Sequence, residues 1–98
     1  MEYIKIDQSA AGTTVIKAAT AGQQVLLFGL FGTLADAGTI QLVDSDGTAL
    51  TGAMEVAADT PVAFGGAGAA ILSSAGNKGL SITTGTGKFK GWAAVRVT

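Results

Sequence analysis

The sequence predicts a single all-β domain built from two packed sheets, and three observations lead to this prediction. Its 98 residues suit one domain. Its 15 glycines punctuate segments rich in Val, Ile and Thr, a pattern typical of short strands joined by tight turns. The composition, with 48% hydrophobic residues and a net charge of −1, is that of a folded chain, because disordered chains combine low hydrophobicity with high charge.

The N-terminal segment Tyr3–Asp7 alternates weakly between apolar and charged residues. It is predicted to be either the first strand or part of an arm (residues 1–8) that reaches a neighbouring molecule. The loop Gln8–Gly12 then leads to a strand at residues 13–18, which is rich in β-branched residues.

Residues 24–47 contain the densest apolar run of the chain and are predicted to form a long β-hairpin that turns at residues 35–38. Large apolar side chains occupy both odd and even positions of its first strand, and Leu26, Phe28 and Leu30 share one face. Antiparallel strands usually alternate between apolar and polar residues, because one face meets water. We expect both faces of this strand to be covered.

A helix is the alternative for this run, because Leu27, Leu30, Phe31 and Leu34 follow the i, i+3, i+4, i+7 spacing. Two glycines would then lie inside the helix, each costing about 1 kcal/mol relative to alanine. No Ser, Thr, Asp or Asn precedes Val25 to cap such a helix. We therefore predict a strand.

Burial of both faces of this strand requires a second molecule. Each fully buried Leu or Phe contributes about 1.5–3 kcal/mol, so leaving several of them in water would be costly for a small domain. The sandwich core covers one face, and the sequence offers no convincing helix to cover the other. We therefore expect the protein to form a homo-oligomer.

The segment Asp44-Ser45-Asp46-Gly47 has two interpretations. A hairpin turn is typical of Asp followed by Gly, because these residues tolerate positive φ angles. A calcium loop is the alternative, since Asp44 and Asp46 would supply carboxylates and Glu55 stands twelfth from Asp44. The turn is favoured, because an EF-type loop needs its glycine at the sixth position and Gly47 is at the fourth.

The second half of the chain is predicted to contain short strands at residues 48–50, 53–56, 62–64 and 80–84. Pro61 is expected at a strand start or an edge, because it cannot donate to a ladder. Residues 65–70 are expected to form a loop and not a dinucleotide site, since no helix pattern follows them. Residues 85–88 are interpreted as a hairpin turn, because Phe89 stands where a phosphate-binding loop needs Ser or Thr.

The last strand, residues 89–97, has two distinct faces. The face expected in the core carries Phe89, Gly91, Ala93, Val95 and Val97. The other face carries Trp92, the single tryptophan, together with Arg96. Trp92 is interpreted either as a partly buried residue at the sheet edge or as an interface anchor, because Trp and Arg are enriched among binding hot spots.

The composition argues against catalysis and against nucleic-acid binding. Histidine and cysteine are absent, which removes the commonest bases, nucleophiles and transition-metal ligands. The six basic residues are scattered and form no stripe, and one Trp with one Tyr makes a poor sugar platform. Polar residues and glycines interrupt the longest uncharged spans, so no membrane helix is predicted. We expect no enzyme, no cofactor, no nucleic acid and no membrane as partner.

Four segments carry a resemblance to a known family: VLLFGL (Val25–Leu30), TIQLVDSDGTALTG (Thr39–Gly52), GLSI (Gly79–Ile82) and KGWAAV (Lys90–Val95). Over most of its length the chain resembles small jelly-roll proteins of tailed bacteriophages, in particular the head decoration (cement) proteins that sit as trimers on the capsid. The Gly/Ala-rich stretch at residues 65–70 and the lack of a long anchoring arm depart from that pattern.

This resemblance implies a jelly roll of about eight strands, a trimer, the major capsid protein as partner, and a position on the outer surface of the virion. The residues that we expect at the subunit or capsid interface are Tyr3, Leu26, Phe28, Leu30, Phe64, Trp92 and Arg96. The alternatives are a tail or fibre module that adheres to a host receptor and another small β-sandwich binding module, for example one that binds calcium through Asp44 and Asp46.

Overall fold

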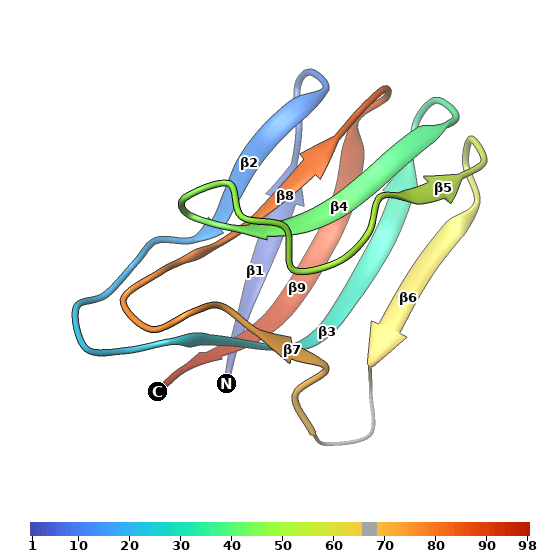
Figure 1. Cartoon of the computed structure of the whole chain (residues 1–98). Coiled ribbons are helices and arrows are strands. Elements are labelled where there is room, and N and C mark those ends of the chain that lie inside the picture. Colours follow the sequence, from blue (N-terminus) through green and yellow to red (C-terminus); the bar gives the residue numbers. More distant parts are fainter. Residues whose placement is uncertain (66–68) are drawn as a thin grey trace.

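The computed structural model describes residues 1–65 and 69–98, which form two antiparallel sheets packed face to face (Figure 1). The all-β prediction is confirmed, and the helical alternative for residues 25–34 is wrong, because these residues form a strand. Sheet A has the order β1-β9-β3-β6, with β7 also paired to β3, and sheet B has the order β2-β8-β4-β5. The strands are β1 (Glu2–Asp7), β2 (Gly12–Lys17), β3 (Val25–Leu34), β4 (Gly38–Asp44), β5 (Met54–Val56), β6 (Pro61–Gly65), β7 (Leu72–Ser73), β8 (Leu80–Thr84) and β9 (Phe89–Val97).

This strand order is that of a jelly roll, because the chain repeatedly crosses from one sheet to the other. The crossings overturn two predicted hairpins. β3 and β4, which were expected to pair within residues 24–47, lie in different sheets, and so do β8 and β9 on either side of residues 85–88. Both connections are corners of the sandwich.

Close backbone packing accounts for the two corners. At Gly38, which follows the first corner, an added Cβ atom would lie 2.9 Å from the Cβ of Thr86 in the second. Gly87 in the second corner has a φ of +79°, and a Cβ atom there would lie 3.0 Å from the backbone nitrogen of Asp36. The two corners therefore pack against each other at one end of the sandwich. Local Gly and Asp patterns do not distinguish such corners from hairpin turns.

The N-terminal segment belongs to the protein's own sheet and is not a free arm. β1 pairs with β9 along its whole length, from Glu2 opposite Val95 to Asp7 opposite Lys90. At the opposite edge of sheet A, β6 begins at Pro61, as predicted for a proline on an edge strand. Residues 66–68 of the predicted loop at 65–70 lie outside the described part of the chain.

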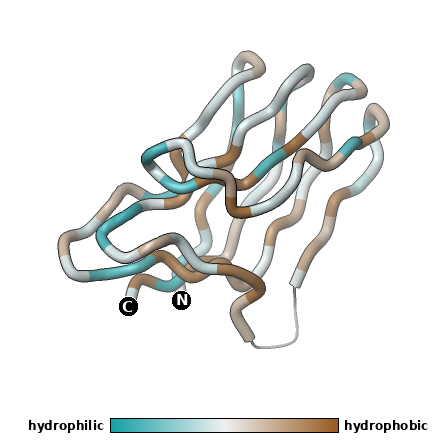
Figure 2. The backbone as a smooth tube through the Cα atoms, in the orientation of Figure 1, coloured by the Kyte–Doolittle hydropathy of each residue, from teal (hydrophilic) through white to brown (hydrophobic). Residues whose placement is uncertain are grey.

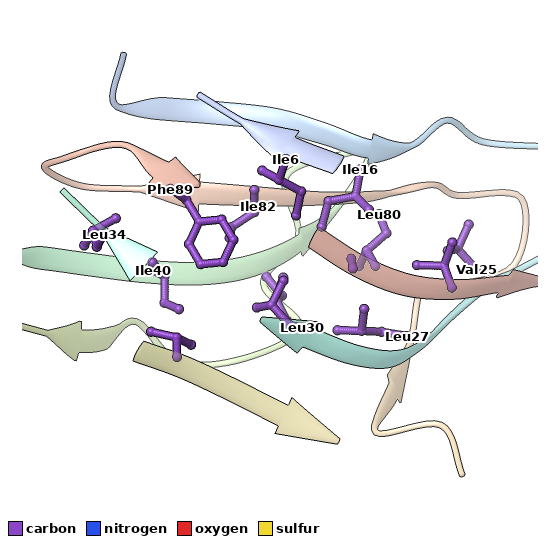
Figure 3. Close-up of a cluster of buried hydrophobic side chains, with 14 residues drawn as sticks. Ile6, Ile16, Val25, Leu27, Leu30, Leu34, Ile40, Leu80, Ile82 and Phe89 are labelled. Carbon is purple, nitrogen blue, oxygen red and sulfur yellow. The ribbon is translucent and has the colours of Figure 1, made fainter. Parts of the chain in front are cut away.

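The core lies between the two sheets, where aliphatic side chains surround Phe89 (Figure 3). β3 contributes Val25, Leu27, Leu30 and Leu34, each no more than 1% exposed. The face of β9 that begins with Phe89 also points inward, as predicted. Burial of these side chains is the main stabilising contribution to a domain of this size.

A β-bulge at Phe28 explains why the core residues of β3 do not alternate regularly. The pairing of β3 with β9 shifts by one residue between Leu27 and Gly29, so Phe28 is the extra residue. Odd-numbered residues face the core before the bulge, and even-numbered residues face it afterwards. Leu30 is consequently buried in the core, and the prediction that it shares one face with Leu26 and Phe28 is wrong.

The two long sides of the sandwich differ. On the β1–β2 side, Lys17 Nζ forms an ion pair with Glu2 Oε1 (2.8 Å), and the side chain of Gln8 donates hydrogen bonds to the segment that contains β2. On the β5–β6 side, Phe64 and Ile71 remain 38% and 43% exposed. Hydrophobic colours mark this part of the chain, along β6 and towards β7 (Figure 2). One side of the sandwich is thus closed and the other is open.

Candidate functional site: an aromatic sheet face

The outer face of sheet A carries the exposed aromatic side chains of Tyr3, Phe31 and Trp92 and the half-buried Phe28, and we call it the aromatic face. The register places Phe31 of β3 beside Trp92 of β9, with their rings stacked at a centroid distance of 5.9 Å. Tyr3 of β1 packs edge-on against Trp92 at 5.7 Å, with the ring planes 75° apart. Tyr3 is 70% exposed, Phe31 47% and Trp92 42%. Aromatic residues presented in this way are typical anchors of protein interfaces.

Small residues form a shallow depression beside the aromatic row. Ala94 of β9 pairs with Gly29 of β3, which in turn pairs with Gly65 of β6. The depression has a volume of about 390 Å³, and Phe28 and Phe31 line it on the two sides of Gly29 along β3. The aromatic face therefore combines protruding aromatic side chains with a depression, into which side chains of a partner can fit.

A cation lies at one end of this face. The guanidinium carbon of Arg96 lies 5.5 Å from the ring centroid of Phe28. Within the part of the chain that the structure describes, Arg96 has no carboxylate partner, whereas Lys90 of the same strand is paired with Asp7. A guanidinium stacked on a ring keeps its charge. It is available to a carboxylate of a partner.

The outer face of sheet B is polar. The hydroxyl groups of Thr13 and Thr83 lie 2.8 Å apart, and the Gln41 side chain donates to the carbonyl oxygen of Thr51 (2.9 Å). Among the described residues, Val15 (61% exposed) is the large apolar side chain that this sheet presents to water. The two sheets thus bury similar core faces but have opposite outer faces, one apolar and aromatic, the other hydroxyl-rich.

The structure brings together five of the seven predicted interface residues on the aromatic face: Tyr3, Leu26, Phe28, Trp92 and Arg96. Leu30 is not among them, because it lies in the core at 1% exposure. Phe64 pairs directly with Leu30, so its side chain is on the inward side of sheet A, at the open side of the sandwich.

Phe31 belongs to this face but was not predicted there. In a regular strand it would share a face with Val25 and Leu27, both of which are core residues. The bulge at Phe28 moves Phe31 to the outside. Two consecutive apolar residues followed by glycine, as in Leu27-Phe28-Gly29, are the available sequence signal, since glycine inside a strand often marks a bulge.

The segment Asp44–Gly47 forms a turn. The Asp44 Oδ1 atom accepts hydrogen bonds from the backbone nitrogens of Asp46 (2.9 Å) and Thr48 (3.1 Å), and Gly47 has a φ of +84°. The Asp46 carboxylate is paired with Lys78 (2.7 Å), and this hydrogen bond raises the pKa of Lys78. Both carboxylates therefore have local partners, which supports the turn interpretation over the calcium alternative.

Within residues 1–65 and 69–98, no group of three His, Cys, Asp or Glu residues is placed to hold a metal ion. The same residues include no helix that is long and apolar enough to cross a membrane.

Comparisons with protein-family models, with curated proteins and with solved structures found no match for this chain.

Proposed function

We propose that this protein is a structural component of a virion, which binds the outer surface of a phage capsid as a trimer and stabilises the shell. The observation that carries the proposal is the contrast between the outer faces of the two sheets. An apolar aromatic surface on a small domain marks an interaction site, because leaving such a patch in water is unfavourable. The capsid as partner follows from the resemblance to head decoration proteins.

The arrangement of the aromatic side chains favours a protein partner over a sugar. Sugar rings stack on flat platforms of coplanar aromatic rings. The ring plane of Tyr3 lies 75° from that of Trp92, so any such platform is limited to Trp92 and Phe31, whose planes are 27° apart. Packing of aliphatic and aromatic side chains into the relief of this face suits a protein surface.

Binding to a shell requires no catalysis. A trimer that lands where capsid subunits meet contacts several of them at once, so that modest contacts act together through a high effective concentration. A protein that binds the assembled shell but not its separate subunits stabilises the shell by mass action.

The test is to mix the purified protein with undecorated shells of the source phage. The protein is expected to co-sediment with the shells and to raise the temperature at which they break open. The control is an unrelated β-sandwich protein of similar mass at the same concentration. Absence of co-sedimentation together with unchanged heat resistance would overturn the proposal. Binding to host cells but not to shells would also overturn it, in favour of a tail or fibre adhesion module.

A further inference from the structure

The open side of the sandwich is a second apolar surface, distinct from the aromatic face. We define the open side by Leu42, Met54, Phe64, Ile71 and Leu72, which line a hollow of about 450 Å³ between the edges of the two sheets. None of the residues that line this hollow is charged. Phe64 and Ile71 are its most exposed large side chains. The hollow is large enough to receive an aromatic ring.

The aromatic face and the open side point in different directions. The aromatic face covers the outside of sheet A, whereas the open side lies between β5 of one sheet and β6 of the other. One flat twofold contact between two copies covers one of these surfaces and leaves the other in water. A closed ring gives each copy two neighbours, because its contacts are head-to-tail and join two different surfaces.

The strand order places the two halves of such a contact at opposite edges of the molecule. Tyr3 lies on β1, at one edge of sheet A, and Phe64 lies on β6, at the other. The β1 edge of one copy can therefore meet the β6 edge of the next copy without either copy using the same surface twice.

The charges of the two edges are complementary. On the β1 side of sheet A, Lys5 and Arg96 are exposed cations without an ion-pair partner in the described part of the chain, since Glu2 and Asp7 are already paired. On the opposite side, residues 48–65 contain Glu55 and Asp59 and no Lys or Arg. The two acidic residues are exposed and form no ion pair with any described residue. The molecule thus has a basic edge with a protruding aromatic residue on one side and an acidic edge with an apolar hollow on the other.

The area of the aromatic face approaches what one contact of a ring needs. A stable interface buries about 800 Å² per partner, and each copy in a ring makes two such contacts through two different surfaces. The outer face of sheet A spans four strands about 4.8 Å apart, and β3 has ten residues at about 3.3 Å each, which gives a footprint of about 600 Å².

We propose that copies of this chain associate head-to-tail, with Tyr3 and the β1 edge of one copy packed into the open side of the next. The number of copies in the ring, three, rests on the proposed function. The inference specifies which surfaces meet, and it predicts that high salt weakens the ring, because the edge charges are exposed and screened.

The experiment uses two variants, Tyr3→Glu on the aromatic side and Ile71→Glu on the open side. Each variant alone is expected to be monomeric by light scattering. Mixed in equal amounts at high concentration, they are expected to form a 1:1 complex, because the Ile71→Glu copy still offers Tyr3 and the Tyr3→Glu copy still offers the hollow. A matched control, Val15→Glu on the outer face of sheet B, is expected to keep the wild-type mass.

Circular dichroism and thermal unfolding check that each variant is folded, and Phe64→Glu replaces Ile71→Glu if the latter does not fold. Two monomeric variants that stay monomeric when mixed would overturn the head-to-tail contact, and so would a wild-type protein that is a monomer or a dimer. These readouts are independent of shell binding. If the protein forms a trimer and passes the mixing test but does not bind shells, the head-to-tail contact is supported and the proposed function is overturned.

Discussion

Among single residues, Gln8 is a buried polar side chain that connects several strands. It is only 3% exposed, and its Oε1 atom accepts hydrogen bonds from the backbone nitrogen of Phe89 (2.9 Å) and the hydroxyl of Thr84 (3.0 Å). Its Nε2 atom donates to the carbonyl oxygen of Gly12 and to the hydroxyl of Thr14, both at 3.0 Å. One side chain thus links the end of β1 to β2, β8 and β9, with all of its hydrogen-bonding groups satisfied.

Replacement of Gln8 by leucine is expected to lower the free energy of unfolding by about 2–4 kcal/mol, because buried partners such as the Phe89 amide lose their hydrogen bonds and gain none. Chemical denaturation measures this loss. The control is Gln23→Leu at an exposed position, which is expected to change stability by less than about 0.5 kcal/mol. Similar losses for the two variants would contradict the assigned role of Gln8.

At the scale of the strand, the bulge in β3 decides which residues belong to the core and which to the surface. Leu26 and Leu30 have the same parity in the sequence, yet Leu30 is buried and Leu26 lies half-buried on the outer face of sheet A. Periodicity alone assigns them to the same face. The inserted residue reverses that assignment.

Leu30→Ala is expected to cost about 2–5 kcal/mol of unfolding free energy, because it leaves a cavity in the core. Leu26→Ala is expected to cost less than about 1.5 kcal/mol, since its side chain is already partly in water. Urea denaturation of the two variants under the same conditions checks the difference. Equal losses would mean that β3 has no bulge at Phe28.

The strands were more predictable than their connections. β3, β8 and β9 could be located from apolar content and alternation, which are local properties of the sequence. The pairing of β3 with β9 and not with β4 joins residues that are far apart in the chain, as does the contact between the corners at Gly38 and Thr86. Likewise, Trp92 and Tyr3 could be proposed as interface residues from their type, but Phe31 could not, because the bulge that exposes it is a feature of strand pairing.

For the molecule as a whole, the absence of histidine sets the response to pH. A hydrogen bond from Lys90, together with the charge of that lysine, lowers the pKa of Asp7 below its ordinary 3.8. The hydrogen bond to Asp46 raises the pKa of Lys78 above its ordinary 10.5. The Asp7 pair stabilises the fold above pH 3.8 and loses its effect as the pH falls through the lowered pKa. The Lys78 pair stabilises the fold below pH 10.5 and loses its effect as the pH rises through the raised pKa.

The free energy of unfolding is therefore expected to be nearly constant between about pH 5 and pH 9, since the two groups with shifted pKa values, Asp7 and Lys78, titrate outside that range. Urea denaturation across this range measures it. Asp7→Asn is expected to lower the plateau, because the ion pair with Lys90 is lost, and to reduce the further loss of stability below about pH 4. A step near neutral pH would contradict this account of the charges.

The difference between the two long sides of the sandwich also bears on how the molecule opens. The Glu2–Lys17 ion pair and the hydrogen bonds of Gln8 hold the two sheets together along the β1–β2 side, which can act as a hinge. Among the described residues, the β5–β6 side has no comparable ion pair between side chains of the two sheets. Thermal fluctuations should separate the sheets first at β5 and β7, where the strands are shortest. A neighbouring copy bound at this side would hold the two sheets together. Assembly is therefore expected to slow hydrogen exchange of the backbone amides in β5 and β7, where the isolated chain opens most readily.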